Sequence, residues 1–147
     1  MKKSIAIFLV CLTLLLAGCG QQTYDDGSII VVIGYDQPTE YTVDLTKVKK
    51  DKGFLSVLQY LQEEYNLEIA YTDSGYGAYL TKVGSLEENP LSGAYIYVYT
   101  SVQADFDVSQ YAVFVDYKGE TLWSSGLGIT QMTIEDGCTI YVGVIYW

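Results

Sequence analysis

The sequence predicts an α+β domain in which a β-grasp-like mixed sheet packs against a single helix. Three observations point to this fold class. A β-branched hairpin comes first, one amphipathic helix follows, and the remainder of the chain alternates in the manner of short strands. One helix lying across a mixed sheet is an α+β arrangement.

The first two strands are separated by a proline. Residues 28–34 read Ser-Ile-Ile-Val-Val-Ile-Gly, a β-branched run that is typical of a strand. Gln37-Pro38 breaks this run, and residues 40–45 alternate as a second strand. Together they predict a hairpin.

The predicted helix spans residues 54–66. Apolar residues at spacings of four, three and four form one stripe, and most of the polar residues lie off it. Gly53 precedes the helix, and Asn66 is placed to cap its C-terminus. The stripe consists of Phe54, Leu58, Leu61 and Tyr65.

The second half of the chain is rich in strand patterns. Residues 94–102 alternate clearly, with three tyrosines facing one way and Ile96 and Val98 facing the other. Lys118-Gly119 and Glu135-Asp136-Gly137 are predicted turns. The predicted strands are 67–71, 78–83, 94–102, 111–117, 120–123 and 139–147.

The N-terminus has the organisation of an export signal. Met1-Lys2-Lys3 is cationic, the run 5–16 is apolar apart from one threonine, and Leu16-Ala17-Gly18-Cys19 resembles the bacterial lipobox. Residues 1–18 are therefore predicted to be a lipoprotein signal peptide and Cys19 the lipidated residue. Residues 19–27 then form a short tether for the domain 28–147, which we expect outside the cytoplasm, held to the cell membrane by lipid.

Composition limits the possible functions. The net charge is −10, and the 18 acidic residues all lie beyond the predicted signal. Such a surface repels phosphate backbones, so no nucleic-acid partner is expected. The chain has no histidine, which excludes Ser-His-Asp and Cys-His catalysis as well as imidazole-ligated zinc.

Two minor features have more than one interpretation. Cys138 lies between a turn and an apolar strand, where core packing is the favoured role. Four lysines cluster in residues 47–52 and form either a solvated loop or a contact with anionic lipid headgroups.

Several short motifs resemble bacterial surface domains similar to the C-terminal domain of transcobalamin. They are a glycine before the helix, Gly-Tyr-Gly followed by Tyr-aliphatic-Thr-Lys-aliphatic, an aromatic strand, and an acidic-Gly turn into the last strand. The matching segments are 53–58, 75–83, 95–98 and 135–140. The chain departs from the pattern where Tyr95 replaces tryptophan and Cys138 replaces an aspartate. The resemblance implies the β-grasp fold and, at the level of the family, a corrinoid ligand.

Aromatic residues are the best candidates for a binding surface. All 15 tyrosines lie beyond the predicted signal, and tyrosine combines an apolar ring with a polar tip. We predict a shared ligand-binding patch of Tyr76, Tyr79, Trp123 and Ser124, with Tyr95 at its edge. The alternative is that the tyrosine row simply covers one face of the sheet.

Three functions follow, in order of preference. The first is a non-enzymatic, membrane-anchored binding protein for a small amphipathic ligand. The second is a surface protein-interaction or adhesion module, and the third is a carboxylate-based hydrolase using pairs such as Glu63-Glu64, Glu87-Glu88 or Asp105 with Asp107. Neither a cofactor nor a metal is expected. Asp105 and Asp107, two residues apart in an extended segment, are the alternative as calcium ligands.

Overall fold

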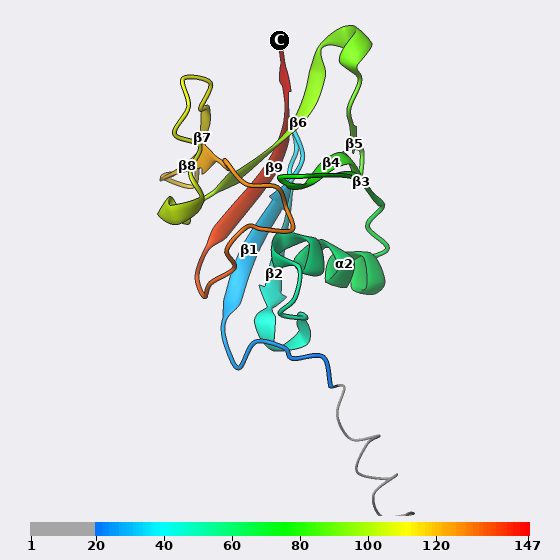
Figure 1. The fold of residues 1–147 in the computed structure, drawn as a ribbon, viewed down its shortest axis with the longest axis vertical. Coiled ribbons are helices and arrows are strands. Elements are labelled where there is room, and N and C mark those ends of the chain that lie inside the picture. Colours follow the sequence, from blue (N-terminus) through cyan, green and yellow to red (C-terminus); the bar gives the residue numbers. More distant parts are fainter. Residues whose placement is uncertain (1–19) are drawn as a thin grey trace, which may run out of the picture.

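The computed structural model describes residues 20–147, so the predicted signal peptide and Cys19 lie outside the described residues. Six strands form the larger sheet in the order β2-β1-β9-β6-β8-β7 (Figure 1). Only β1 and β9 pair in parallel within it, so the sheet is mixed. The strands are β1 (Ser28–Ile33), β2 (Thr39–Asp44), β6 (Ala94–Thr100), β7 (Phe114–Tyr117), β8 (Glu120–Ser124) and β9 (Thr139–Tyr146).

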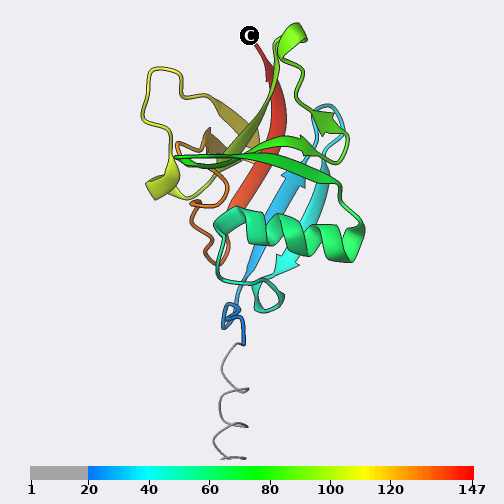
Figure 2. The same ribbon diagram turned by 45° about the vertical axis from the view of Figure 1, so that its right-hand side comes forward.

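Helix α2 (Gly53–Tyr65) lies across one face of this sheet (Figure 2). Phe54, Leu58 and Leu61 are fully buried, as the apolar stripe predicts. Asn66 adopts the left-handed conformation at φ 55° and ends the helix as its C-cap. Tyr65 differs from the prediction because 53% of it is exposed. Its ring lies 5.3 Å from that of Tyr41 on the edge strand β2, at the rim of the core.

Gly53 explains how the helix begins. Its φ is +52°, and a Cβ there would lie 2.6 Å from the carbonyl oxygen of Met132. The N–H of Leu55 in the first turn donates to the carbonyl of Ile129 at 3.1 Å. The start of the helix is therefore held against the loop between β8 and β9.

Three further strands form a separate small sheet above the helix (Figure 2). They are β3 (Ile69–Ser74), β4 (Gly77–Val83) and β5 (Leu86–Glu87). The predicted α+β fold, a mixed sheet packed against one helix, is confirmed, and the division of the strands into two sheets is an additional feature. The edge of β6 that faces away from β9 already pairs with β8 and with Asn89. Strand β4 packs its apolar residues onto the shared core instead.

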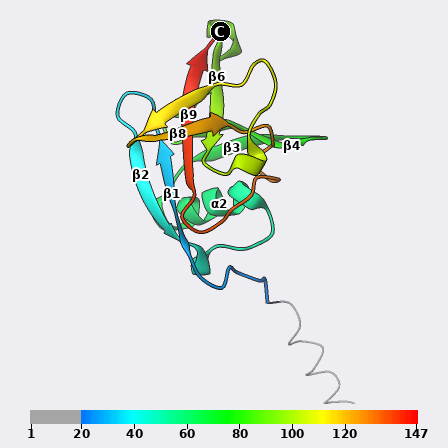
Figure 3. The same cartoon turned by 90° about the vertical axis from the view of Figure 1, so that its left-hand side faces the viewer.

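The β7–β8 hairpin folds over the opposite face of the larger sheet (Figure 3). Its two-residue turn uses Lys118 and Gly119 at φ 49° and 86°, as predicted. Strand β7 begins only at Phe114, later than expected, because the chain before it forms a loop. A second apolar cluster of Val32, Tyr99, Leu122 and Tyr141 lies beneath the hairpin.

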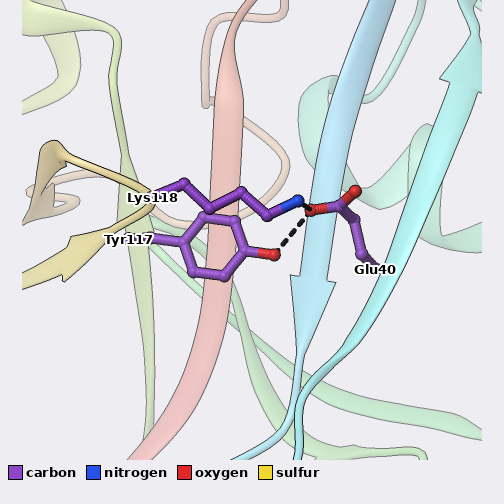
Figure 4. A network of polar contacts seen from close by, with 3 residues as sticks. All are labelled: Glu40, Tyr117 and Lys118. Atoms are coloured by element: carbon purple, nitrogen blue, oxygen red, sulfur yellow. Dashed lines mark hydrogen bonds and ion pairs between the residues drawn. The ribbon is translucent and has the colours of Figure 1, made fainter.

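A polar contact fastens the tip of this hairpin to the far edge of the sheet (Figure 4). The Tyr117 hydroxyl and the Lys118 ammonium both donate to Glu40 on β2, at 2.5 and 2.6 Å. The hydrogen bonds from Lys118 and Tyr117 lower the pKa of the Glu40 carboxyl. The sheet therefore curls until its two edge strands, β2 and β7, are linked by these side chains.

Strand β9 is the most deeply buried strand, and Ile140, Val142 and Val144 belong to the main core cluster together with residues of α2. Three short 3₁₀ segments complete the chain at Leu45–Lys47, Pro90–Ser92 and Gln103–Asp105. Within residues 20–147, no helix has the length and apolarity needed to cross a membrane.

Candidate ligand-binding groove

A hollow lies where the small sheet meets β6. It has a volume of about 320 Å³, the lower end of the range typical of small-molecule sites. Strand β4 supplies one wall, β6 supplies the floor, and the segment after β8 supplies the other wall. The lining residues are Tyr79, Leu80, Glu88, Tyr95, Ile96, Tyr97, Val98, Asp107, Ser125, Leu127 and Ile129.

The groove combines an apolar floor with a polar rim. Leu80 and Ile129 are buried, whereas Tyr79 and Leu127 remain 49% and 36% exposed. The rim carries the carboxylates of Glu88 and Asp107. Apolar walls with a few placed polar groups are characteristic of ligand sites.

Along the floor of the groove, part of the edge of β6 is not paired with another strand of the described chain. The backbone N–H and carbonyl groups of Ala94, Ile96 and Val98 point away from β9. Their partners show this orientation. Ala94 exchanges two hydrogen bonds with Asn89, the Ile96 N–H donates to the Glu88 carboxylate, and the Val98 carbonyl accepts from the Ser125 N–H. Two groups on this edge have no partner among residues 20–147. They are the carbonyl of Ile96 and the N–H of Val98.

The loop wall is fixed by buried polar contacts. Asp105 is 2% exposed, and its carboxylate accepts from the N–H and the hydroxyl of Thr133 at 2.6 and 2.9 Å. The N–H of Ile129 donates to the carbonyl of Ala78 on β4 at 2.7 Å. Gly128 makes the close approach possible, since a Cβ there would lie 2.8 Å from the backbone of Gly77.

Two of the five predicted ligand-binding residues meet in this groove. Tyr79 comes from β4 and Tyr95 from β6, and both line it. Whether they bind a ligand stays a prediction.

The other three predicted residues do not line the groove. Tyr76 lies at the β3–β4 turn and is 80% exposed. Trp123 packs its ring against Phe106 and Phe114, at 6.3 and 5.3 Å between centroids. Ser124 is 1% exposed, and its hydroxyl accepts from the N–H of Val113, so the hydroxyl serves the local structure.

The residues that shape the floor and the loop wall are not among the predicted site residues. The alternation of residues 94–102 predicts only that Ile96 and Val98 face away from the tyrosines, and no element is predicted around Leu127 and Ile129. The run Ser-Ser-Gly-Leu-Gly, residues 124–128, does carry a signal for this wall, because glycines allow backbones to approach closely.

The carboxylate pairs do not gather into a metal centre among the described residues. Residues 20–147 contain no group of three or more metal-ligating side chains. The Asp105 carboxylate accepts two hydrogen bonds from Thr133, whereas the Asp107 carboxylate accepts one from the N–H of Ser109. Glu63 and Glu64 are exposed on the helix.

Cys138 packs in the core, as predicted, and is only 4% exposed. Burial raises the pKa of its thiol to about 11. We therefore expect no reaction with a thiol reagent such as Ellman's reagent at pH 8 in the folded domain, and complete reaction in denaturant. Rapid modification of the native domain would show that the thiol is accessible.

The same pKa shift makes stability depend on pH. Because the pKa of the Cys138 thiol is higher in the folded than in the unfolded chain, the stabilisation from this group is present at neutral pH and is lost as the pH rises toward 11.

Comparison with known proteins supports the fold. No protein-family model matches the chain, and no curated protein matches it. Haptocorrin, in a crystal structure in complex with Cbi, superposes with a TM-score of 0.60 at 15% identity, covering 89% of this chain and 28% of haptocorrin. A putative metal binding protein from Ruminococcus gnavus ATCC 29149 superposes with a TM-score of 0.52 at 16% identity, covering 82% of this chain and 98% of that protein. The chain thus spans under a third of haptocorrin, and it shares with both proteins the fold that the transcobalamin-like motifs predict.

Proposed function

We propose that this protein is a membrane-anchored, extracytoplasmic binding lipoprotein that holds a small amphipathic ligand in the groove between β4 and β6. The observation that carries the proposal is the groove itself, which places apolar side chains, two tyrosines and two unpaired backbone groups around one hollow. The proposed binding role is non-enzymatic.

A corrinoid is the first candidate ligand. Haptocorrin, which shares this fold, was crystallised in complex with Cbi. A corrinoid is a flat ring with apolar faces and amide side chains around its rim, which suits an apolar floor bordered by hydrogen-bonding groups. The rim carboxylates of Glu88 and Asp107, together with the net charge of −10, favour an uncharged or cationic ligand over an anionic one.

Calorimetric titration of the domain 20–147 with dicyanocobinamide tests this proposal. Removing a ring from the groove should weaken binding at least about tenfold, as expected for a truncated aromatic anchor. We therefore expect Tyr79→Ala to weaken binding by this amount. Tyr111→Ala is the matched control, since Tyr111 is 64% exposed and lies outside the groove. Equal affinities for both variants would contradict binding in the groove. Absence of heat with the unmodified domain would contradict a corrinoid ligand.

The anchor has its own test. The thiol of Cys19 is the group that the lipobox presents for acylation. We therefore expect Cys19→Ala to abolish incorporation of a fatty-acid probe and to block cleavage after Gly18 in a bacterial host. Cys138→Ala is the control and should be labelled like the unmodified protein. Equal labelling of Cys19→Ala would overturn the lipoprotein assignment.

A second candidate function is protein interaction through another surface. Tyr35, Tyr146, Trp147 and Leu91 are all more than half exposed, and the Tyr35 and Tyr146 rings meet edge to face at 6.2 Å. Exposed apolar groups gathered in this way are typical of interaction sites. Sedimentation of the domain with and without Tyr146→Ser distinguishes self-association through this end from binding in the groove.

A further inference from the structure

The open edge of β6 points to one chemical group on the ligand. We infer that the groove recognises its ligand through amide groups, with an amide N–H donating to the Ile96 carbonyl and an amide carbonyl accepting from the Val98 N–H. This inference rests on the proposed function, because it places these groups in the same groove. It adds the class of ligand, an amide-bearing molecule.

The hydrogen-bond pattern of the edge is the first support. In a strand, the N–H and the carbonyl of one residue point to the same side, so Ile96 and Val98 present four groups toward the groove. Glu88 occupies the Ile96 N–H at 3.3 Å, and Ser125 occupies the Val98 carbonyl at 2.8 Å. The remaining acceptor and donor belong to residues i and i+2, the pair that one residue of a parallel neighbouring strand satisfies.

The length of the gap is the second support. Asn89 pairs with Ala94 at one end, and Ser125 bonds to Val98 at the other. The four residue steps between these two points span about 13 Å of strand. Among residues 20–147, no further strand fills this gap. The gap is long enough for a primary amide or for one residue of an extended peptide with its two neighbours.

The surroundings favour a ligand that excludes water from these two bonds. The side chains of Ile96 and Val98 are half-buried against the main core, and Tyr79 and Leu127 border the same hollow. A backbone group that lacks a partner in such a place loses free energy unless a ligand or water satisfies it. A primary amide carries a donor and an acceptor on one side, and one residue of an extended peptide presents its own N–H and carbonyl to one side of the chain.

Two kinds of molecule carry this group, namely the side-chain amides of a corrinoid and the backbone of a short peptide. Dicyanocobinamide and the capped peptide acetyl-Lys-Val-Lys-amide represent them as probes. The lysines of the peptide complement the carboxylates of Glu88 and Asp107 on the rim. The probe that binds the unmodified domain identifies the source.

Val98→Pro is the decisive variant, because proline removes the backbone N–H. That N–H makes no bond to β9, and proline is tolerated in a strand where the N–H faces an open edge. Val98→Ala is the matched control, since it loses side-chain contacts but keeps the N–H. For the probe that binds, we expect Val98→Pro to have an affinity about fivefold to tenfold lower than Val98→Ala, the range of one buried hydrogen bond.

Hydrogen exchange provides a measurement that needs no variant. The Val98 amide of the unmodified domain should exchange at least about tenfold more slowly when the groove is saturated, because it then donates to the ligand. Equal affinities of Val98→Pro and Val98→Ala, or an unchanged Val98 exchange rate under saturation, would overturn the amide inference while leaving ligand binding intact. Failure of both probes to bind would overturn the proposed function and this inference with it.

Discussion

Replacing Leu58 with alanine is expected to lower the free energy of unfolding by about 2–5 kcal/mol, the usual cost of truncating a buried leucine. Leu58 has no exposed surface and belongs to the main core cluster, together with residues of β1 and β9. Alanine would leave a cavity at the centre of the main core. Urea denaturation followed by far-ultraviolet circular dichroism measures the change.

Glu63→Ala provides the control on the same helix. Glu63 is exposed, and alanine is a strong helix former, so this variant should change the unfolding free energy by less than about 0.5 kcal/mol. Equal losses for the two variants would mean that the helix presents a different face to the sheet.

Replacing Asp105 with alanine is the second change with a large expected effect. The carboxylate is buried and accepts two hydrogen bonds from Thr133, and hydrogen bonds to charged groups contribute about 1.5–3 kcal/mol. We expect a loss of about 2–4 kcal/mol, because the variant leaves the Thr133 N–H without its acceptor. Ligand affinity should fall as well, since the β8–β9 loop that contains Thr133 also provides one wall of the groove.

Asp116→Ala is the matched control, because Asp116 also accepts from a threonine, Thr121, but on the surface. This exposed pair should contribute less than about 1 kcal/mol. If urea denaturation gave the same small change for both aspartates, Asp105 would not hold the loop in the way that the structure indicates.

Much of the fold was predictable because its signals are local. The β-branched run 28–34, the spacing of Phe54, Leu58 and Leu61, and the Lys118-Gly119 turn each report on residues close together in the sequence. The split into two sheets was not predictable in this way. It depends on how β8 and Asn89 occupy the edge of β6, a contact between distant segments.

The groove was only partly predictable for the same reason. Tyr79 and Tyr95 stood out because aromatic residues signal recognition surfaces, and both line the groove. Trp123 carried the same signal, yet its ring packs against Phe106 and Phe114. The open edge at Ile96 and Val98 consists of backbone groups, which every residue carries, so no side-chain pattern marks it.

The central claim is that a ligand binds between β4, β6 and the β8–β9 loop. A titration of ¹⁵N-labelled domain 20–147 with dicyanocobinamide, followed by amide chemical shifts, tests it most directly. We expect the largest shifts at Tyr79, Val98 and Leu127, with Tyr111 and Phe114 unchanged, because the latter two are exposed elsewhere. Shifts confined to Tyr111 and Phe114, or no shifts at saturating ligand, would contradict the claim.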